Sequence, residues 1–195
     1  MPGYFYPRKK GVPHLQTTPI AYVSREQIKT GTVSYKDAVY AALKSNAVTL
    51  MQPRLDRLIR EFSGTLWLDD SHQNHMECLN YDLGYVHGRN CNEYYAAMYL
   101  LTANQDIYRR TGNCYCYKKI IFSYAILAEI TPHNYTLFHA ARRICEDTKK
   151  ISILDLMEPE TVDDEAFKLI INAFLILTYG LCALKLNKGG IYTNE

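Results

Sequence analysis

The stretch LIINAFLILTYGLCAL, residues 169–184, is a run of sixteen mostly apolar residues between Lys168 and Lys185. A helix that crosses a bilayer needs about 20 such residues, and this run also contains the polar residues Asn172 and Thr178. We therefore predict a buried helix at the centre of a helical domain, and not a membrane span.

Helix boundaries can be placed in the first half of the chain from capping residues. Ser34, with an acidic residue three positions later, is typical of a helix N-cap, and we expect this first helix to end near Asn46. Pro53 suits the first position of a second helix, which Gly64 would close. A third helix is predicted with Ser71 as its N-cap.

The second half of the chain contains three further helix starts and one ambiguous segment. Asn92 begins a predicted helix, and Thr131 followed by Pro132 is typical of an N-cap and first helical position. The last long helix is predicted after Thr161, where acidic residues fill the first turn. Residues 117–130 are rich in β-branched and aromatic side chains, and we interpret them as a helix, with a strand as the alternative.

These elements predict a mainly α protein with a single compact domain of about six to seven helices over residues 34–188. Residues 1–33 contain a proline every five or six residues, which predicts an irregular, basic and aromatic arm. The domain divides into a basic helical pair, residues 34–64, and an acidic helical body, residues 71–188. Residues 189–195 would be a tail.

Charge is divided unevenly along the chain. Residues 1–60 carry ten Lys/Arg against three Asp/Glu, a net charge of +7, whereas residues 61–195 carry twelve against seventeen, a net charge of −5. The basic end could approach an anionic partner, or it could match the acidic remainder of the same molecule. The residues predicted to bind a partner or nucleic acid are Tyr4, Tyr6, Arg8, Lys9, Lys10, Arg54, Arg57 and Arg60.

Tyrosine and cysteine usage narrow the class of protein. The chain has seventeen Tyr against six Phe, and tyrosine suits both contact surfaces and the boundary of a core. The six cysteines are expected to be reduced thiols in the cytoplasm, because residues 1–10 lack the apolar segment of a secretory signal.

Three histidines and an acidic residue form a candidate metal site. His72 and His75 lie one turn apart on one face of the predicted helix. With a carboxylate from Asp69 or Asp70, and with His87 from the following loop, they could bind Zn²⁺ or another divalent ion. The other interpretation is that the acidic residues and Ser71 cap the helix, and that its histidines face solvent.

Cys114 and Cys116 form a C-x-C pair, with Cys91 upstream. A closed zinc site usually has C-x-x-C pairs, and a second pair is missing, so small buried thiols are the simpler interpretation. The sequence contains no G-x-S-x-G, P-loop or G-x-G-x-x-G motif. Nucleophilic catalysis therefore has no support from sequence motifs.

Four stretches resemble one known family: residues 71–75, YAAMYLL at residues 95–101, residues 109–110, and FHAAR at residues 138–142. Across residues 71–145 the chain resembles an uncharacterised family of small helical proteins from bacteria and their mobile elements. The resemblance implies a phage- or plasmid-like setting, where small proteins often block a host defence enzyme or regulate their own element. It implies no activity.

Three functions remain open from the sequence. The first is a non-enzymatic binding protein that contacts a protein or nucleoprotein complex of a bacterial host, such as an anti-CRISPR-like inhibitor of a defence nuclease. In it, the acidic body could occupy a nucleic-acid channel. The second is a nucleic-acid-binding protein that uses the basic N-terminal region. The third is a metal-dependent hydrolase. For the first we expect no cofactor and no membrane partner.

Overall fold

Helix α9 (Asp164–Tyr179) and the 3₁₀ helix η3 (Gly180–Lys185) contain the apolar run and form the centre of the protein. Asp163 caps α9, its Oδ1 accepting a hydrogen bond from the Ala166 amide at 2.8 Å. The stretch Asp164–Lys185 is long and apolar enough to cross a membrane, but most of it is buried inside the domain. The predicted central buried helix is confirmed.

The computed structural model describes residues 22–43, 45–83, 90–116, 119–146 and 160–187. These residues form a single, mainly helical domain with eight α-helices. A two-stranded antiparallel hairpin joins β1 (Tyr115–Cys116) to β2 (Lys119–Ile120). The other α-helices are α1 (Arg25–Lys29), α2 (Tyr35–Ala42), α3 (Ser45–Arg60), α4 (Asp70–Asp82), α5 (Asn92–Leu101), α6 (Gln105–Thr111) and α7 (Pro132–Glu146).

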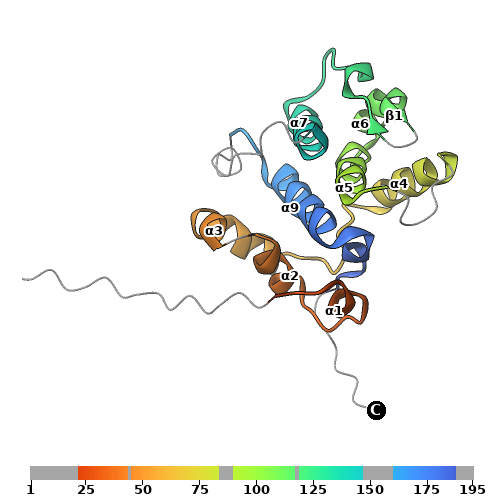
Figure 1. The fold of residues 1–195 in the computed structure, drawn as a ribbon. Helices are drawn as coiled ribbons and strands as arrows, with labels where there is room; N and C mark the ends of the chain where they lie inside the picture. The colour runs from red at the N-terminus through yellow and green to blue at the C-terminus, as the bar shows by residue number, and fades with distance from the viewer. Residues whose placement is uncertain (1–21, 44, 84–89, 117–118, 147–159, 188–195) are drawn as a thin grey trace, which may run out of the picture.

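Helix α5 is the second core element. All its residues from Tyr94 to Leu101 are buried, because α5 packs against both α7 and α9. In Figure 1, α9 runs through the middle of the domain, with α5 and α7 on one side and α2 and α3 on the other. Helices α4 and α6 lie outside α5.

A buried polar network joins four parts of this core. The Tyr35 hydroxyl on α2 donates to Asn172 Oδ1 on α9 at 2.8 Å. The amide of Asn172 donates to the Leu66 carbonyl at 3.1 Å and to the Tyr99 hydroxyl on α5 at 3.2 Å, and the Tyr99 hydroxyl in turn donates to the Leu66 carbonyl. The network therefore fixes the link between α3 and α4 against the two central helices.

Several predicted helix starts are confirmed. Ser34 caps α2, with its Oγ accepting from the Asp37 amide at 3.2 Å. Helix α5 begins at Asn92 and α7 begins at Pro132, as predicted. In each case the signal is local, because a cap is made by residues within one turn of the helix end.

Part of the predicted irregular arm is folded. Helix α1 lies within residues 1–33, and Val23, Ile28 and Val33 around it are buried. The prediction of irregular structure is therefore wrong for residues 22–33, because apolar side chains at these spaced positions pack α1 against η3. Residues 1–21, the rest of the arm, lie outside the described residues, as does the tail at 189–195.

The predicted boundary between the first two helices is wrong. Helix α2 ends at Ala42, and α3 already begins at Ser45, so Pro53 lies inside α3. A proline in a helix costs one hydrogen bond, but Met51, Leu55 and Leu58 continue one buried face across it. That burial outweighs the lost bond. Helix α3 also ends at Arg60, before Gly64.

Two predictions in the second half are also corrected. The N-cap of α4 is Asp69 and not Ser71, since Asp69 Oδ1 accepts from the His72 amide at 2.8 Å. Residues 117–130 do not form a helix: where described, they contain strand β2, the 3₁₀ helix η2 (Phe122–Tyr124) and an irregular stretch.

Glycine is required at the junction of α9 and η3. Gly180 has φ +76°, and a Cβ at this position would lie 3.1 Å from Asn92 Oδ1. The Asn92 amide donates to the Leu177 carbonyl at 2.9 Å, so the close approach locks α5 against the end of α9.

Candidate contact surface

The histidine predicted to bind metal is a core residue. His72 is fully buried, its Nε2 lies 2.8 Å from the Tyr99 carbonyl, and its Nδ1 accepts from the Leu68 amide at 3.2 Å. Burial lowers the pKa of His72 to about 4, against a smaller opposing effect of the bond to Tyr99. Both ring nitrogens thus hold backbone groups and the imidazole is neutral.

The other predicted metal ligands do not surround His72. His75 stacks on Tyr108 of α6 with ring centroids 4.5 Å apart and contacts Gln105 Oε1 at 2.8 Å. Asp70 is exposed at the start of α4. His87 lies outside the described residues. Over the parts of the chain that are described, no three His, Cys, Asp or Glu residues gather as a metal site would need.

The C-x-C pair lies at the hairpin. Cys114 is buried, which raises the pKa of its thiol to about 11, with a smaller effect of nearby Cys116. Cys91 is exposed at the start of α5. The buried Cys114 is therefore a protonated core thiol at neutral pH.

The basic stripe of α3 is partly matched inside the molecule. Arg54 donates to Asp164 Oδ1 at 3.0 Å and to the Val162 carbonyl at 2.8 Å, and its guanidinium lies 4.2 Å from the centre of the Phe167 ring. Arg57 forms an ion pair with the same Asp164. Two of the predicted nucleic-acid contacts thus join α3 to the acidic start of α9.

The remaining predicted contact residues are divided. Arg60 is exposed and, with Lys36, borders a hollow of about 240 Å³ over the stacked rings of Tyr35 and Phe62. The predicted contacts outside the described residues are Tyr4, Tyr6, Arg8, Lys9 and Lys10.

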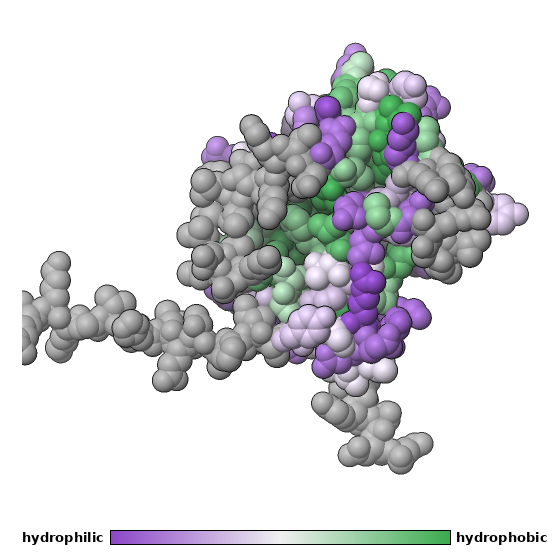
Figure 2. All heavy atoms as spheres, in the orientation of Figure 1, coloured by the Kyte–Doolittle hydropathy of each residue, from purple (hydrophilic) through white to green (hydrophobic). Residues whose placement is uncertain are grey.

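Large hydrophobic side chains are exposed at a few places. Figure 2 shows hydrophobic residues reaching the surface over the upper and middle parts of the described domain, interspersed with polar ones. Tyr124, Ile126 and Tyr135 are 58%, 55% and 47% exposed and lie within one stretch of twelve residues. We call residues 122–135 the arch: they run from η2 into the first turn of α7.

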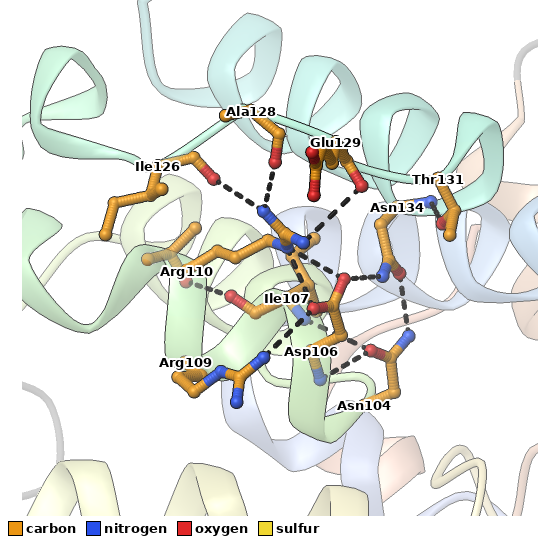
Figure 3. A network of polar contacts seen from close by, with 11 residues as sticks. Asn104, Asp106, Ile107, Arg109, Arg110, Ile126, Ala128, Glu129, Thr131 and Asn134 are labelled. Atoms are coloured by element: carbon orange, nitrogen blue, oxygen red, sulfur yellow. Dashed lines mark hydrogen bonds and ion pairs between the residues drawn. The ribbon is translucent and has the colours of Figure 1, made fainter.

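A single arginine holds the arch in shape (Figure 3). Arg110 Nη1 donates to the carbonyls of Ala128 at 2.6 Å and Ile126 at 3.2 Å, and Nη2 donates to the Glu129 carbonyl at 3.5 Å. Its Nε contacts both carboxylate oxygens of Asp106, at 2.8 and 2.9 Å. We call this arrangement the Arg110 clamp. Its guanidinium donates to carbonyls that backbone N–H groups would have bound if the segment were a helix.

The clamp extends into α7 through amides. Asn134 donates to Asp106 Oδ2 at 2.9 Å and accepts from the Asn104 amide at 2.8 Å. Burial alone would raise the pKa of Asp106, but the bonds and charge of Arg110, with Asn134, outweigh it and lower the pKa. Asp106 therefore stays ionised, and the middle of the arch and its α7 end are tied to α6.

Glu129, within the clamped segment, has a strained backbone conformation. Its φ is +56°, in the left-handed region that favours glycine, and its carbonyl is one of those that Arg110 binds. The arch is thus an irregular segment with a defined conformation.

We expect Arg110→Ala to lower the free energy of unfolding by about 2–3 kcal/mol, because it removes the donor of three carbonyls and leaves Asp106 without its main cationic partner, with the Asn134 amide still donating to it. Arg109→Ala is the matched control: Arg109 is exposed and 3.7 Å from Asp106, so its loss should cost less than about 0.5 kcal/mol. Urea unfolding measures both. Equal losses would show that the clamp does not hold the arch.

Sequence reasoning missed the arch. Its β-branched and aromatic residues suggested a regular element, whereas its conformation depends on Arg110, which lies sixteen to nineteen residues earlier. The available signal was Asp106 and Arg110 at positions i and i+4, but that spacing does not reveal which carbonyls the guanidinium also binds.

None of the family models, curated proteins or solved structures compared with this chain matches it.

Proposed function

We propose that this protein is a non-enzymatic binding protein that acts in the bacterial cytoplasm by contact with a host protein or nucleoprotein complex. Its specific form would be an inhibitor of a defence nuclease, encoded by a phage or mobile element, as the resemblance over residues 71–145 implies. The observation that carries the proposal is the arch, which presents Tyr124, Ile126 and Tyr135 on a clamped backbone.

The physical argument concerns the cost of binding. Binding through a mobile loop loses affinity to the ordering of that loop, and a preformed loop avoids this cost. Tyrosine adds a large contact area with few rotatable bonds, which is why it is enriched at interfaces. On the arch, Tyr135 also packs edge-on against His139, with ring centroids 4.2 Å apart.

The histidines favour contact over hydrolysis. A ligand or general base needs a ring nitrogen that can reach the substrate or metal, but both nitrogens of His72 hold backbone groups. His75 contacts the Thr102 carbonyl at 3.2 Å with one nitrogen and Gln105 with the other. Metal chemistry at this helix would require breaking these contacts.

The test is capture from cytosolic extract of the bacterial host, with half of each sample treated with nuclease. We expect Tyr124→Ser combined with Tyr135→Ser to reduce the captured protein at least about tenfold, since aromatic side chains dominate interface energies. Tyr22→Ser is the matched control, because Tyr22 is the most exposed of the tyrosines cited and lies away from the arch in sequence.

The outcomes separate the candidate functions. A protein that survives nuclease and is lost only with the arch variant supports the proposal. A partner that is captured equally by the arch variant and the control overturns the role of the arch. Recovery of nucleic acid alone, abolished by nuclease, would instead support the basic N-terminal region as a nucleic-acid-binding site.

A further inference from the structure

We propose that the outer face of α4 docks into a groove of the partner lined by Lys and Arg, of the kind that otherwise holds nucleic acid. This inference rests on the proposed binding function and adds a second contact, with its chemistry, to the arch. The juxtaposition that carries it is a pair of exposed carboxylates, Asp70 and Glu77, without a basic partner among the described residues, on the same helix face as a highly exposed tyrosine. Glu77 accepts a hydrogen bond from the neutral amide of Gln73, at 2.8 Å.

Helix α4 has two distinct faces. His72, Met76 and Leu79 are buried against the domain. On the opposite side, an exposed stripe with helical spacing of four, three and four residues contains Asp70, Asn74, Glu77 and Tyr81.

The carboxylates of this region have no basic partner. Residues 61–88 contain five Asp/Glu and no Lys or Arg. Among the described residues, no Lys or Arg forms an ion pair with the acidic side chains of α4 or its N-cap, while acidic groups elsewhere, such as Asp106 and Asp164, are paired. The charge of α4 is thus available to a partner.

The spacing of the charges excludes a single metal ion as their natural occupant. Asp70 and Glu77 are seven residues apart, which is about 10 Å along a helix, whereas the ligands of one Ca²⁺ or Mg²⁺ lie about 2.0–2.6 Å from the ion. An extended row of cations matches such a stripe, and one ion does not.

Tyr81 points to the same chemistry. Its side chain is 87% exposed, so the face of its ring is accessible to a partner beside the two carboxylates. Arginine binds to the face of a tyrosine ring through cation–π attraction, and carboxylates beside the ring pair with neighbouring cations. A groove rich in Lys and Arg offers partners to both parts of the stripe.

The stripe has a rigid base that it shares with the arch. His75 on the inner side of α4 stacks on Tyr108 of α6, and α6 also carries Arg110 of the clamp. Both surfaces are therefore attached to one helix, so one partner can reach both without ordering a linker.

The test measures binding of the full chain to a fluorescein-labelled decaarginine probe by anisotropy, at about 100 mM salt, where the Debye length is about 10 Å. We expect Asp70→Asn with Glu77→Gln to raise Kd at least about fivefold, and Tyr81→Ser at least about threefold. The matched control, Glu93→Gln with Glu160→Gln, neutralises two exposed carboxylates elsewhere and should change Kd less than about twofold. Thermal melts confirm that each variant is folded.

Three results would overturn the inference. One is the same Kd for the α4 variant and the control. The second is that added Mg²⁺ or Ca²⁺ weakens decaarginine binding by the wild type as much as the α4 substitutions do, but has no effect on the α4 variant. This result would assign the stripe to a metal ion. The third is at least about fivefold tighter binding by an Arg8→Gln, Lys9→Gln, Lys10→Gln variant, which would make the chain's own arm the occupant.

The capture experiment keeps this inference separate from the proposed function. If the arch variant loses the host partner while the α4 variant keeps it, the binding function stands and the α4 inference fails. If the α4 variant loses both decaarginine and the partner while the arch variant keeps both, the α4 inference stands and the arch is not the contact.

Discussion

Asn172→Ala should lower the free energy of unfolding by about 3–5 kcal/mol, one of the two largest effects that we expect in this protein. Asn172 is fully buried and bonds the Tyr35 hydroxyl, the Leu66 carbonyl and the Tyr99 hydroxyl. Alanine leaves these groups without that partner inside the core, where an unpaired polar group costs about 1–3 kcal/mol. It also leaves a small cavity between three elements.

Urea unfolding monitored by circular dichroism checks this prediction. Asn74→Ala is the matched control, because Asn74 is also on a helix but is exposed, so its loss should change the free energy of unfolding by less than about 0.5 kcal/mol. Tyr35→Phe should cost about 1 kcal/mol. Since Tyr35 and Asn172 share one bond, the double variant should cost less than the sum of the two single ones. A loss below about 1 kcal/mol for Asn172→Ala would show that the network is not stabilising.

The parts of the fold that follow from local chemistry could be predicted from the sequence. Ser34, Asn92 and Pro132 mark helix starts within one turn of themselves, and the apolar run identified the central helix. Such signals depend on neighbours in the chain, so periodicity and capping rules detect them.

The parts that depend on distant residues could not be predicted. Arg54 and Arg57 looked like a basic contact stripe, but their partner Asp164 lies more than a hundred residues away in sequence. The arch depends in the same way on Arg110. A single sequence shows charge and spacing, but it does not show which charges meet in the folded chain.

The candidate contact surface follows the same division. The excess of tyrosine and the acidic body could be read from composition, and both are compatible with a contact protein. Composition does not show which tyrosines are exposed. Tyr94, Tyr95 and Tyr99 are buried, whereas Tyr81 and Tyr124 of the same chain are exposed. The exposed ones are identified only once α5 is seen to be covered by α7 and α9.

The second large effect is a loss of stability in mild acid that depends on His72. Burial lowers the pKa of His72 in the folded protein to about 4, and an unfolded histidine titrates near pH 6.5. Between these values the unfolded chain binds a proton that the folded protein does not, so acid favours unfolding. Stability is fully present above pH 6.5 and should fall by about 3 kcal/mol from pH 7 to pH 4.

The hydrogen bonds of the ring explain why the folded protein resists this proton. The Nε2–H donates to the Tyr99 carbonyl and Nδ1 accepts from the Leu68 amide, so a proton on Nδ1 would face another donor. The other groups with lowered pKa values titrate in a different pH range. The pKa values of Asp106 and Asp163 lie below the usual 3.8, so protonation of these carboxylates lowers the stability only in stronger acid. Between pH 6.5 and pH 4 the loss of stability is therefore due mainly to His72. The partly exposed His139, whose pKa burial also lowers, adds a smaller loss of the same sign.

The only tryptophan of the chain is placed to report the change. The rings of Trp67 and His72 are 5.1 Å apart, so urea unfolding followed by Trp67 fluorescence at pH 7, 6, 5 and 4 measures both the site and the whole domain. His139→Gln, the control, should keep most of the dependence on pH. His72→Gln should be less stable at pH 7 but should lose most of the decrease between pH 7 and pH 4. A wild-type protein equally stable at pH 7 and pH 4 would show that His72 takes up a proton without leaving its buried position, and the neutral imidazole would then not be what holds α4 to α5.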